Sequence, residues 1–337
     1  MTVRRVSGFV AITLSLAIGG GRTDSAEAQA SGPCSRQCLT DLARSYLAAV
    51  VAGTPAAVPL APNLAFVENV TRMNPGEGLW ANAASGPTSF AIYVPDIELQ
   101  QVGFLGVMER EGAQGNEFVI VAVRLKVSGG AITEAEHIVA AANANNMRRL
   151  EKPRPGLLSD VPAGSRKSHA DLANIGMSYY NALDDNDGSL MPFADDCQRH
   201  ENGMVTAGPE AGAGPNADPN RAPVARLCGP QLDSQSFVYI DRIDNRRLVA
   251  ADPVTGLAMG FSHFRHPFTN LPYDVIHTDG SKSQRNKENM RFNPFDMPAA
   301  HIFKVGADGL VHEIEAVGFV APYNSPSGWE RQPGRTE

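Results

Sequence analysis

The chain contains 337 residues, of which 43% are hydrophobic and 7% aromatic, and its formal net charge is -7. This composition excludes a disordered chain, a coiled coil and a collagen-like polymer. The length is sufficient for one large or two small domains. The acidic balance, with no block of basic residues, argues against a protein that binds nucleic acid.

Residues 1–30 have the three parts of a secretory signal peptide. Arg4 and Arg5 precede an apolar run at residues 10–18, and small residues at 28–30 form a cleavage pattern. The run is shorter than the roughly 20 apolar residues of a membrane span. We therefore predict a periplasmic or secreted protein that does not associate with a membrane after cleavage.

Export changes the interpretation of the four cysteines, because thiols outside the cytosol tend to form disulfides. Proximity in the sequence favours the pairs Cys34–Cys38 and Cys197–Cys228, although four cysteines allow three connectivities. A zinc site is the alternative, but these spacings match no compact zinc motif. We expect disulfides and no metal.

The chain contains an internal duplication. Residues 46–69 align with residues 179–202 at a constant offset of 133, which places Tyr46 on Tyr179 and Glu68-Asn69 on Glu201-Asn202. Residues 39–50 and 172–183 carry apolar side chains at the same helical spacing. The spacing predicts an amphipathic helix at the start of each half.

A second matched pair closes each half. Residues 124–137 and 302–315 each contain two apolar strands joined by a glycine-containing turn, which is typical of a β-hairpin. Glu134 and Glu136 align with Glu313 and Glu315 at an offset of 179, so the second half has 46 more residues, the difference between 179 and 133. We place them in two segments, residues 207–223 and 277–298.

These patterns predict an α+β protein with two tandem domains, each a mainly antiparallel sheet covered by helices. Proline and glycine cluster between the two repeats and indicate a linker. The predicted boundaries are a signal peptide at 1–30, a first domain at 31–145, a linker at 146–167, a second domain at 168–323 and a tail at 324–337.

The arrangement of helix, short strand and closing hairpin resembles the nuclear transport factor 2-like superfamily, in which a curved sheet and its helices form a cone. The motifs at 76–80, 124–127 and 132–136, together with the segment 192–203, are similar to an uncharacterised family of exported bacterial and fungal proteins with two such cones. The resemblance covers most of residues 34–322, but the second half lacks the Gly-Glu-Gly-Leu-Trp motif.

The resemblance implies a function without naming a reaction. Cone folds of this kind include isomerases, dehydratases and cyclases that need no cofactor, as well as binding modules. They place acid and base groups inside an apolar pocket, where burial shifts the pKa of these groups. We expect a cofactor-independent lyase or isomerase that acts on a small organic molecule, with a non-catalytic binding protein as the alternative and a homodimer as a possible assembly.

The segment 195–202 concentrates polar side chains. In an extended strand His200 and Asn202 share one face and Glu201 lies on the other. His200 has the side chain best suited to exchange protons near neutral pH, and Asn202 can bind a substrate oxygen. We therefore list His200, Glu201 and Asn202 as candidate catalytic residues. The alternative is that Glu201-Asn202 brace a turn, because asparagine often bonds nearby backbone.

Glu68 is the counterpart of Glu201 in the first half and a further catalytic candidate. Trp80, which follows the glycines at 76 and 78, can line a pocket or lie in the core. Glu134, Glu136, Glu313 and Glu315 lie on the closing hairpins, where an ion-pair ladder or a functional role would explain them.

The segment 262–267 supplies His263 and Arg265 as candidate substrate-binding residues. A metal site at His263 and His266 is the alternative, but no third ligand occurs at a regular spacing. Because the second half has His200 and the additional loop residues, we predict that it carries the site and that the first half mainly packs against it.

Overall fold

The computed structural model describes Met1, residues 32–212 and residues 222–330; the predicted signal peptide lies outside these residues. The described residues from Gly32 onward belong to one compact unit. Among the described residues, no helix combines the length and the apolar character needed to span a bilayer.

The first half contains α1 (Arg36–Val51), α2 (Leu79–Asn82) and one sheet. Its seven strands have the order β2-β1-β7-β6-β5-β3, and β4 pairs with β5. All pairs are antiparallel except β1 and β7. The strands are β1 (Leu60–Glu68), β2 (Thr71–Met73), β3 (Ala83–Ser85), β4 (Ala91–Asp96), β5 (Gln101–Gly112), β6 (Gly115–Ser128) and β7 (Ala131–Ala141).

The second half repeats this plan with α4 (His169–Asp185), α5 (Cys228–Asp233) and a second seven-stranded sheet. The strand order is β10-β11-β14-β15-β8-β9, β16 pairs with β14, and only β8 and β15 run parallel. The strands are β8 (Phe193–Glu201), β9 (Met204–Ala207), β10 (Arg242–Asp252), β11 (Leu257–His266), β14 (Phe295–Val305), β15 (Val311–Gly318) and β16 (Ala321–Pro322).

Shorter elements connect and extend the two sheets. The predicted linker contains α3 (Pro155–Leu158), η3 (Ala163–Ser165) and most of η2 (Ala144–Leu150), which begins two residues before it. The short helices η1 (Pro55–Ala57) and η4 (Gly188–Leu190) each precede the first strand of a sheet. Part of the additional length of the second half forms a separate two-stranded sheet of β12 (Tyr273–Ile276) and β13 (Lys282–Arg285).

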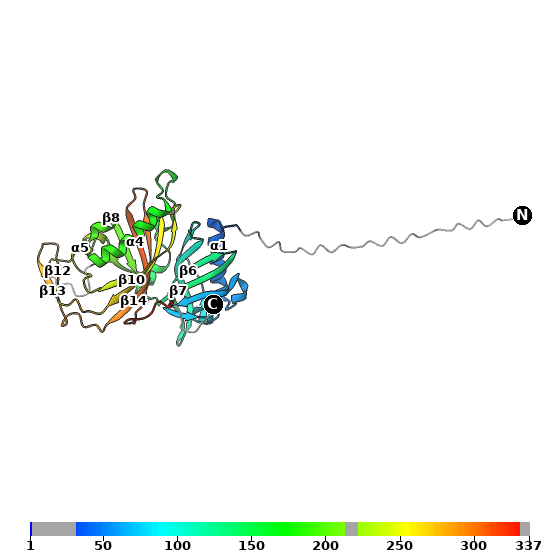
Figure 1. Cartoon of the computed structure of the whole chain (residues 1–337), viewed down its shortest axis with the longest axis horizontal. Helices are drawn as coiled ribbons and strands as arrows, with labels where there is room; N and C mark the ends of the chain where they lie inside the picture. Colours follow the sequence, from blue (N-terminus) through cyan, green and yellow to red (C-terminus); the bar gives the residue numbers. More distant parts are fainter. Residues whose placement is uncertain (2–31, 213–221, 331–337) are drawn as a thin grey trace. The chain divides into compact units, whose positions relative to one another are not determined.

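The two long helices begin in the same way. Ser35 accepts a hydrogen bond from the backbone N–H of Cys38, and Ser168 accepts one from that of Asp171, which caps each helix at its first turn. Helix α1 lies against β4 and β5, and α4 lies against β10 and β11 (Figure 1). The predicted α+β class with two cone-like sheets is confirmed.

The apolar residues form three buried clusters. One lies between α1 and the first sheet and a second between α4 and the second sheet. The third cluster joins the opposite faces of both sheets, with Leu105, Ile120 and Ile138 from the first and Met259 and Ile302 from the second. Each sheet therefore has a helix-covered face and a face that packs against the other half.

Both predicted disulfides are present. Cys34–Cys38 lies at the start of α1, and Cys197–Cys228 joins β8 to α5. The described cysteines include no free thiol. Disulfides in both halves agree with the expected oxidising compartment.

Candidate functional site

A cavity of about 470 Å³ lies between α4 and the helix-covered face of the second sheet, and Ala141, Asn143 and Asn146 from the end of the first half also border it. Most of its wall is apolar or aromatic, and a few polar groups reach it. The lining includes Tyr179, Leu183, Glu201, Asn202, Phe237, Tyr239, Phe264, His266, Phe295, Met297, His301 and Ala316. Its size and character suit a small organic molecule.

The equivalent interior of the first half is filled by a hydrogen-bonded chain of side chains. The Tyr46 hydroxyl contacts His137 Nε2 at 2.9 Å, and His137 Nδ1 contacts the Glu68 carboxylate at 3.0 Å. Tyr46 and His137 are fully buried. Trp80 packs edge-on against Tyr46, with ring centroids 5.2 Å apart.

The sequence around Gly78 explains why Glu68 can lie there. The backbone N–H of Leu79 donates to both carboxylate oxygens of Glu68 at 3.0 Å. Gly78 has φ of 62°, and a Cβ atom at this position would overlap the carboxylate. The Gly-Glu-Gly-Leu-Trp motif therefore holds Glu68 and supplies Trp80 to the core.

Residue exchanges between the repeats account for the difference between the two interiors. Neighbouring strands pair Val123 with His137 in the first half, whereas the corresponding pair in the second half is His301 and Ala316. The imidazole thus moves to the adjacent strand, and Ala316 leaves space in its former position. Phe66, which packs against His137, corresponds to Arg199.

Arg199 connects the polar groups of the second interior. It is 2% exposed, and its guanidinium contacts the Tyr179 hydroxyl at 3.3 Å, Gln231 at 2.6 Å and the Glu201 carboxylate at 3.0 Å. Phe237 covers the guanidinium at 5.3 Å. Such a buried cation requires a carboxylate partner and a full set of acceptors.

Two histidines line the cavity in the neutral form. Burial, together with the nearby Arg199 charge, lowers the pKa of His301 to about 3. Burial lowers the pKa of His266 to about 4 against an opposing effect of Asp296. Burial also raises the pKa of Tyr179 to about 12, so that its hydroxyl keeps its proton at neutral pH.

The alternation predicted for strand β8 is correct, but the cavity lies on the side of Glu201. His200 lies on the opposite face, 5% exposed, with its Nδ1 3.8 Å from the Glu315 carboxylate. Burial, with the charges of Arg154 and Arg149, lowers the pKa of His200 to about 3. His200 is therefore not among the residues that line the large cavity.

The two Glu-Asn pairs have a structural role through their asparagines. The Asn69 side chain exchanges hydrogen bonds of 2.8 and 2.9 Å with the backbone of Val139. Asn202 does the same with Gly318 at 2.9 and 3.0 Å. Both residues have positive φ and end the strand that pairs in parallel. Their side chains bond to the neighbouring strand, 70 and 116 residues away in the sequence, and not to the local turn of the bracing alternative.

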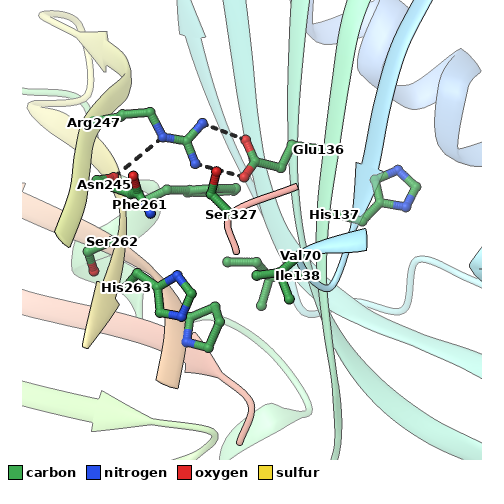
Figure 2. A pocket seen from close by; sticks show the side chains of 11 residues that line it. Val70, Glu136, His137, Ile138, Asn245, Arg247, Phe261, Ser262, His263 and Ser327 are labelled. Carbon is green, nitrogen blue, oxygen red and sulfur yellow. Dashed lines mark hydrogen bonds and ion pairs between the residues drawn. The ribbon is translucent and has the colours of Figure 1, made fainter. Parts of the chain in front are cut away.

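His263 and Arg265 lie on the face of β11 that points toward the first half. Arg265 contacts Asp296 at 2.5 Å and Asp244 at 2.9 Å. His263 borders a cavity of about 20 Å³ that has room for one water molecule. Figure 2 shows this cavity, with Arg247 directed at Glu136 and His137 pointing away. These two candidates are therefore separated from the large cavity.

The glutamates on the closing hairpins are paired. Arg247 binds Glu136 through two contacts of 2.7 and 2.8 Å (Figure 2), and Glu134 contacts Arg124 and Lys126. Arg154 contacts Glu313 at 2.9 Å and Glu315 at 3.4 Å. This agrees with the ion-pair alternative.

The structure brings Glu201 and Asn202 to the cavity, places Glu68 and Trp80 in the filled first interior, and puts His200, His263 and Arg265 elsewhere. Sequence reasoning did not identify Arg199, His301 or Tyr239 as site residues. The signal that could have found the cavity was in the repeat itself, because alanine at 316 replaces histidine at 137.

Comparisons with known proteins find similarity to parts of the chain. Residues 165–318 match the model of a domain of unknown function, DUF8021. No curated protein sequence matches the chain.

Solved structures similar to parts of the chain include PrhC from Penicillium brasilianum NBRC 6234, with 12% identity over 31% of this chain and 82% of that one and a TM-score of 0.27. A hypothetical protein with a ketosteroid isomerase-like fold from Catenulispora acidiphila DSM 44928, in complex with trimethylamine, has 17% identity over 29% of this chain and 83% of its own, with a TM-score of 0.23. A putative polyketide cyclase from Silicibacter sp. TM1040 has 12% identity over 46% of this chain and 92% of its own, with a TM-score of 0.27.

Proposed function

We propose that the second half binds a small, mainly apolar organic molecule in its cavity and catalyses proton transfer on it as a lyase or isomerase. The observation that carries the proposal is the contrast between the two interiors. The cavity is open where the first half is filled, and the residues that open it also supply ionisable groups.

Glu201 is the proposed proton acceptor. Glu201 lines the cavity, its side chain is 41% exposed, and its carboxylate contacts Arg199 at 3.0 Å. His301, which is neutral, lies on the neighbouring wall, where it can form a hydrogen bond with the substrate. Of the other catalytic candidates, His200 lies outside the cavity, Asn202 pairs with backbone, and Glu68 is held in the filled interior.

Binding can be tested with the neutral fluorescent probe N-phenyl-1-naphthylamine. The wild-type protein is expected to bind the probe, and Ala316→Phe, which fills the cavity, is expected to weaken binding by about 10-fold or more. The matched control is Ala48→Phe on the exposed side of α1, which should leave binding unchanged. Equal binding by wild type and Ala316→Phe would place the probe elsewhere and contradict the proposal.

A non-catalytic binding protein is the second candidate, because the Glu201 carboxylate is already paired with Arg199. Glu201→Gln keeps the size of the side chain and removes the base. In a strain that produces only this variant, we expect an unconverted precursor to accumulate in an untargeted metabolite comparison. If the metabolites match those of the wild-type strain while the probe still binds, the protein is a binder.

We also propose that the protein is exported, which both disulfides support. Cell fractionation followed by intact-mass analysis of the exported chain tests this. A mass that lacks residues 1–30 and four thiol protons is expected, and a full-length, fully reduced cytosolic chain would contradict it.

A further inference from the structure

The direction of the Tyr46 hydrogen bond follows from the tautomer of His137. Glu68 accepts from the backbone N–H of Leu79, and a carboxylate has only acceptors, so His137 donates to it through Nδ1–H. In the neutral imidazole the remaining nitrogen, Nε2, is an acceptor. In this tautomer Tyr46 donates its proton to His137.

At the corresponding Tyr179 this direction is reversed. Its partner is the guanidinium of Arg199, which has donors and no acceptor, so the Tyr179 oxygen accepts. In residues 32–212 and 222–330, no carbonyl, carboxylate or imidazole accepts the Tyr179 proton. Tyr179 lines the cavity, and Ala316 has replaced the imidazole that accepts from Tyr46.

We infer that Tyr179 donates its hydroxyl proton to the ligand and so determines which ligands bind. The ligand carries a neutral acceptor in the place that the His137 nitrogen takes in the first half, either an unprotonated sp² nitrogen or a carbonyl oxygen. This inference rests on the proposed function, since it names the chemical class of the molecule in the same cavity. A buried donor without an acceptor is unfavourable, and such a ligand supplies one.

The charges around the cavity favour an uncharged acceptor. Arg199 is almost completely buried and already has Glu201 as its counterion. An anionic ligand would lose its hydration and meet the Glu201 carboxylate without a free cation to balance it. The aromatic side chains of Phe237, Phe264 and Phe295 provide flat apolar walls for the rest of the molecule.

The experiment uses two pairs of compounds of nearly equal shape: quinoline with naphthalene, and 1-tetralone with tetralin. Each pair differs in one acceptor, a nitrogen or a carbonyl oxygen. Their dissociation constants are measured by displacement of N-phenyl-1-naphthylamine from the wild type, Tyr179→Phe and Tyr46→Phe. Hydration differences between the compounds cancel when the ratio within a pair is compared between proteins.

In at least one pair, we expect Tyr179→Phe to reduce by about 10-fold the ratio by which the compound with the acceptor binds more tightly than its partner. This is the scale of one hydrogen bond strengthened by a charged neighbour. The pair that responds identifies nitrogen or oxygen. Tyr46→Phe, the same change in the duplicate position, should leave both ratios unchanged. Unchanged ratios in Tyr179→Phe would overturn the inference, and failure of all four compounds to bind would contradict the cavity-binding proposal itself.

A second measurement does not depend on the variant folding. The infrared carbonyl band of 1-tetralone bound to the wild-type protein should lie at lower wavenumber than in an alkane solvent, because a donated hydrogen bond weakens the C=O bond. If the protein prefers quinoline over naphthalene and the carbonyl band of bound 1-tetralone is not shifted, the acceptor in the ligand is a nitrogen. An unshifted band together with no preference for quinoline over naphthalene would overturn the inference.

Discussion

The two halves share a strand order and a helix cap, but they use their interiors differently. In the first half a tyrosine, a histidine and a glutamate bond to one another and fill the space between α1 and the sheet. In the second half an arginine joins the corresponding tyrosine and glutamate, and a cavity remains. A duplicated fold can therefore keep one copy as a packed support while exchanges at a few inward positions open the other.

Removal of His137 should produce the largest effect on stability. His137→Ala creates a cavity in a filled core and leaves Tyr46 and Glu68 without their buried partner, which is expected to cost about 3–5 kcal/mol. His301→Ala removes a ring from the wall of an existing cavity, together with one long hydrogen bond of 3.4 Å to Tyr180, and should cost about 1–2 kcal/mol.

Urea unfolding followed by tryptophan fluorescence measures both values, since Trp80 lies beside the first interior. The comparison fails if His301→Ala costs as much as His137→Ala, because the second interior would then be as tightly packed as the first.

The two disulfides differ in the length of chain that they close. Cys197 and Cys228 are 31 residues apart and Cys34 and Cys38 are 4 apart. Loop-closure entropy predicts that replacing both cysteines by alanine costs about 4 kcal/mol for the first pair and about 2 kcal/mol for the second. Urea midpoints of the two double variants test this order, and a larger loss at Cys34 and Cys38 would show that local packing dominates.

The features predicted from sequence are those that depend on the repeat or on spacing along the chain. Helix periodicity, the closing hairpins, the Glu-Asn strand ends and the cysteine pairs each depend on local spacing, and these predictions agree with the structure. The alternation of β8 was also correct, because side chains in a strand change face at every residue.

The position of the cavity could not be predicted in the same way. Strand alternation separates His200 from Glu201, but which face meets α4 depends on the packing of the second sheet against the first half. The sequence favours His200 because the ordinary pKa of histidine is near neutrality. In the structure His200 lies on the face of β8 away from the large cavity, and burial together with the nearby Arg154 charge keeps it neutral. Arg199 has no sequence signal, because its role depends on Tyr179, which lies on a different element.

The smallest predicted effect concerns acid stability and distinguishes the second interior from the first. The pKa of His301 is lowered to about 3 in the folded protein by burial and by Arg199, whereas the ordinary value is 6.5. A depressed pKa contributes stability that is present above pH 6.5 and is lost as the pH falls toward 3. Protonation then favours the unfolded chain.

Between pH 7 and pH 5 His301 should therefore account for a loss of about 2 kcal/mol in the free energy of unfolding. His301→Gln stays neutral and should lose that much less than the wild type over this interval in urea titrations at the two pH values. His312→Gln is the control, because hydrogen bonds to Asp308 and Asp196 outweigh burial and raise the pKa of His312, so its contribution has the opposite sign. If the wild type and His301→Gln lose stability equally, the imidazole accepts a proton without penalty, and the second interior is wetter than its aromatic walls indicate.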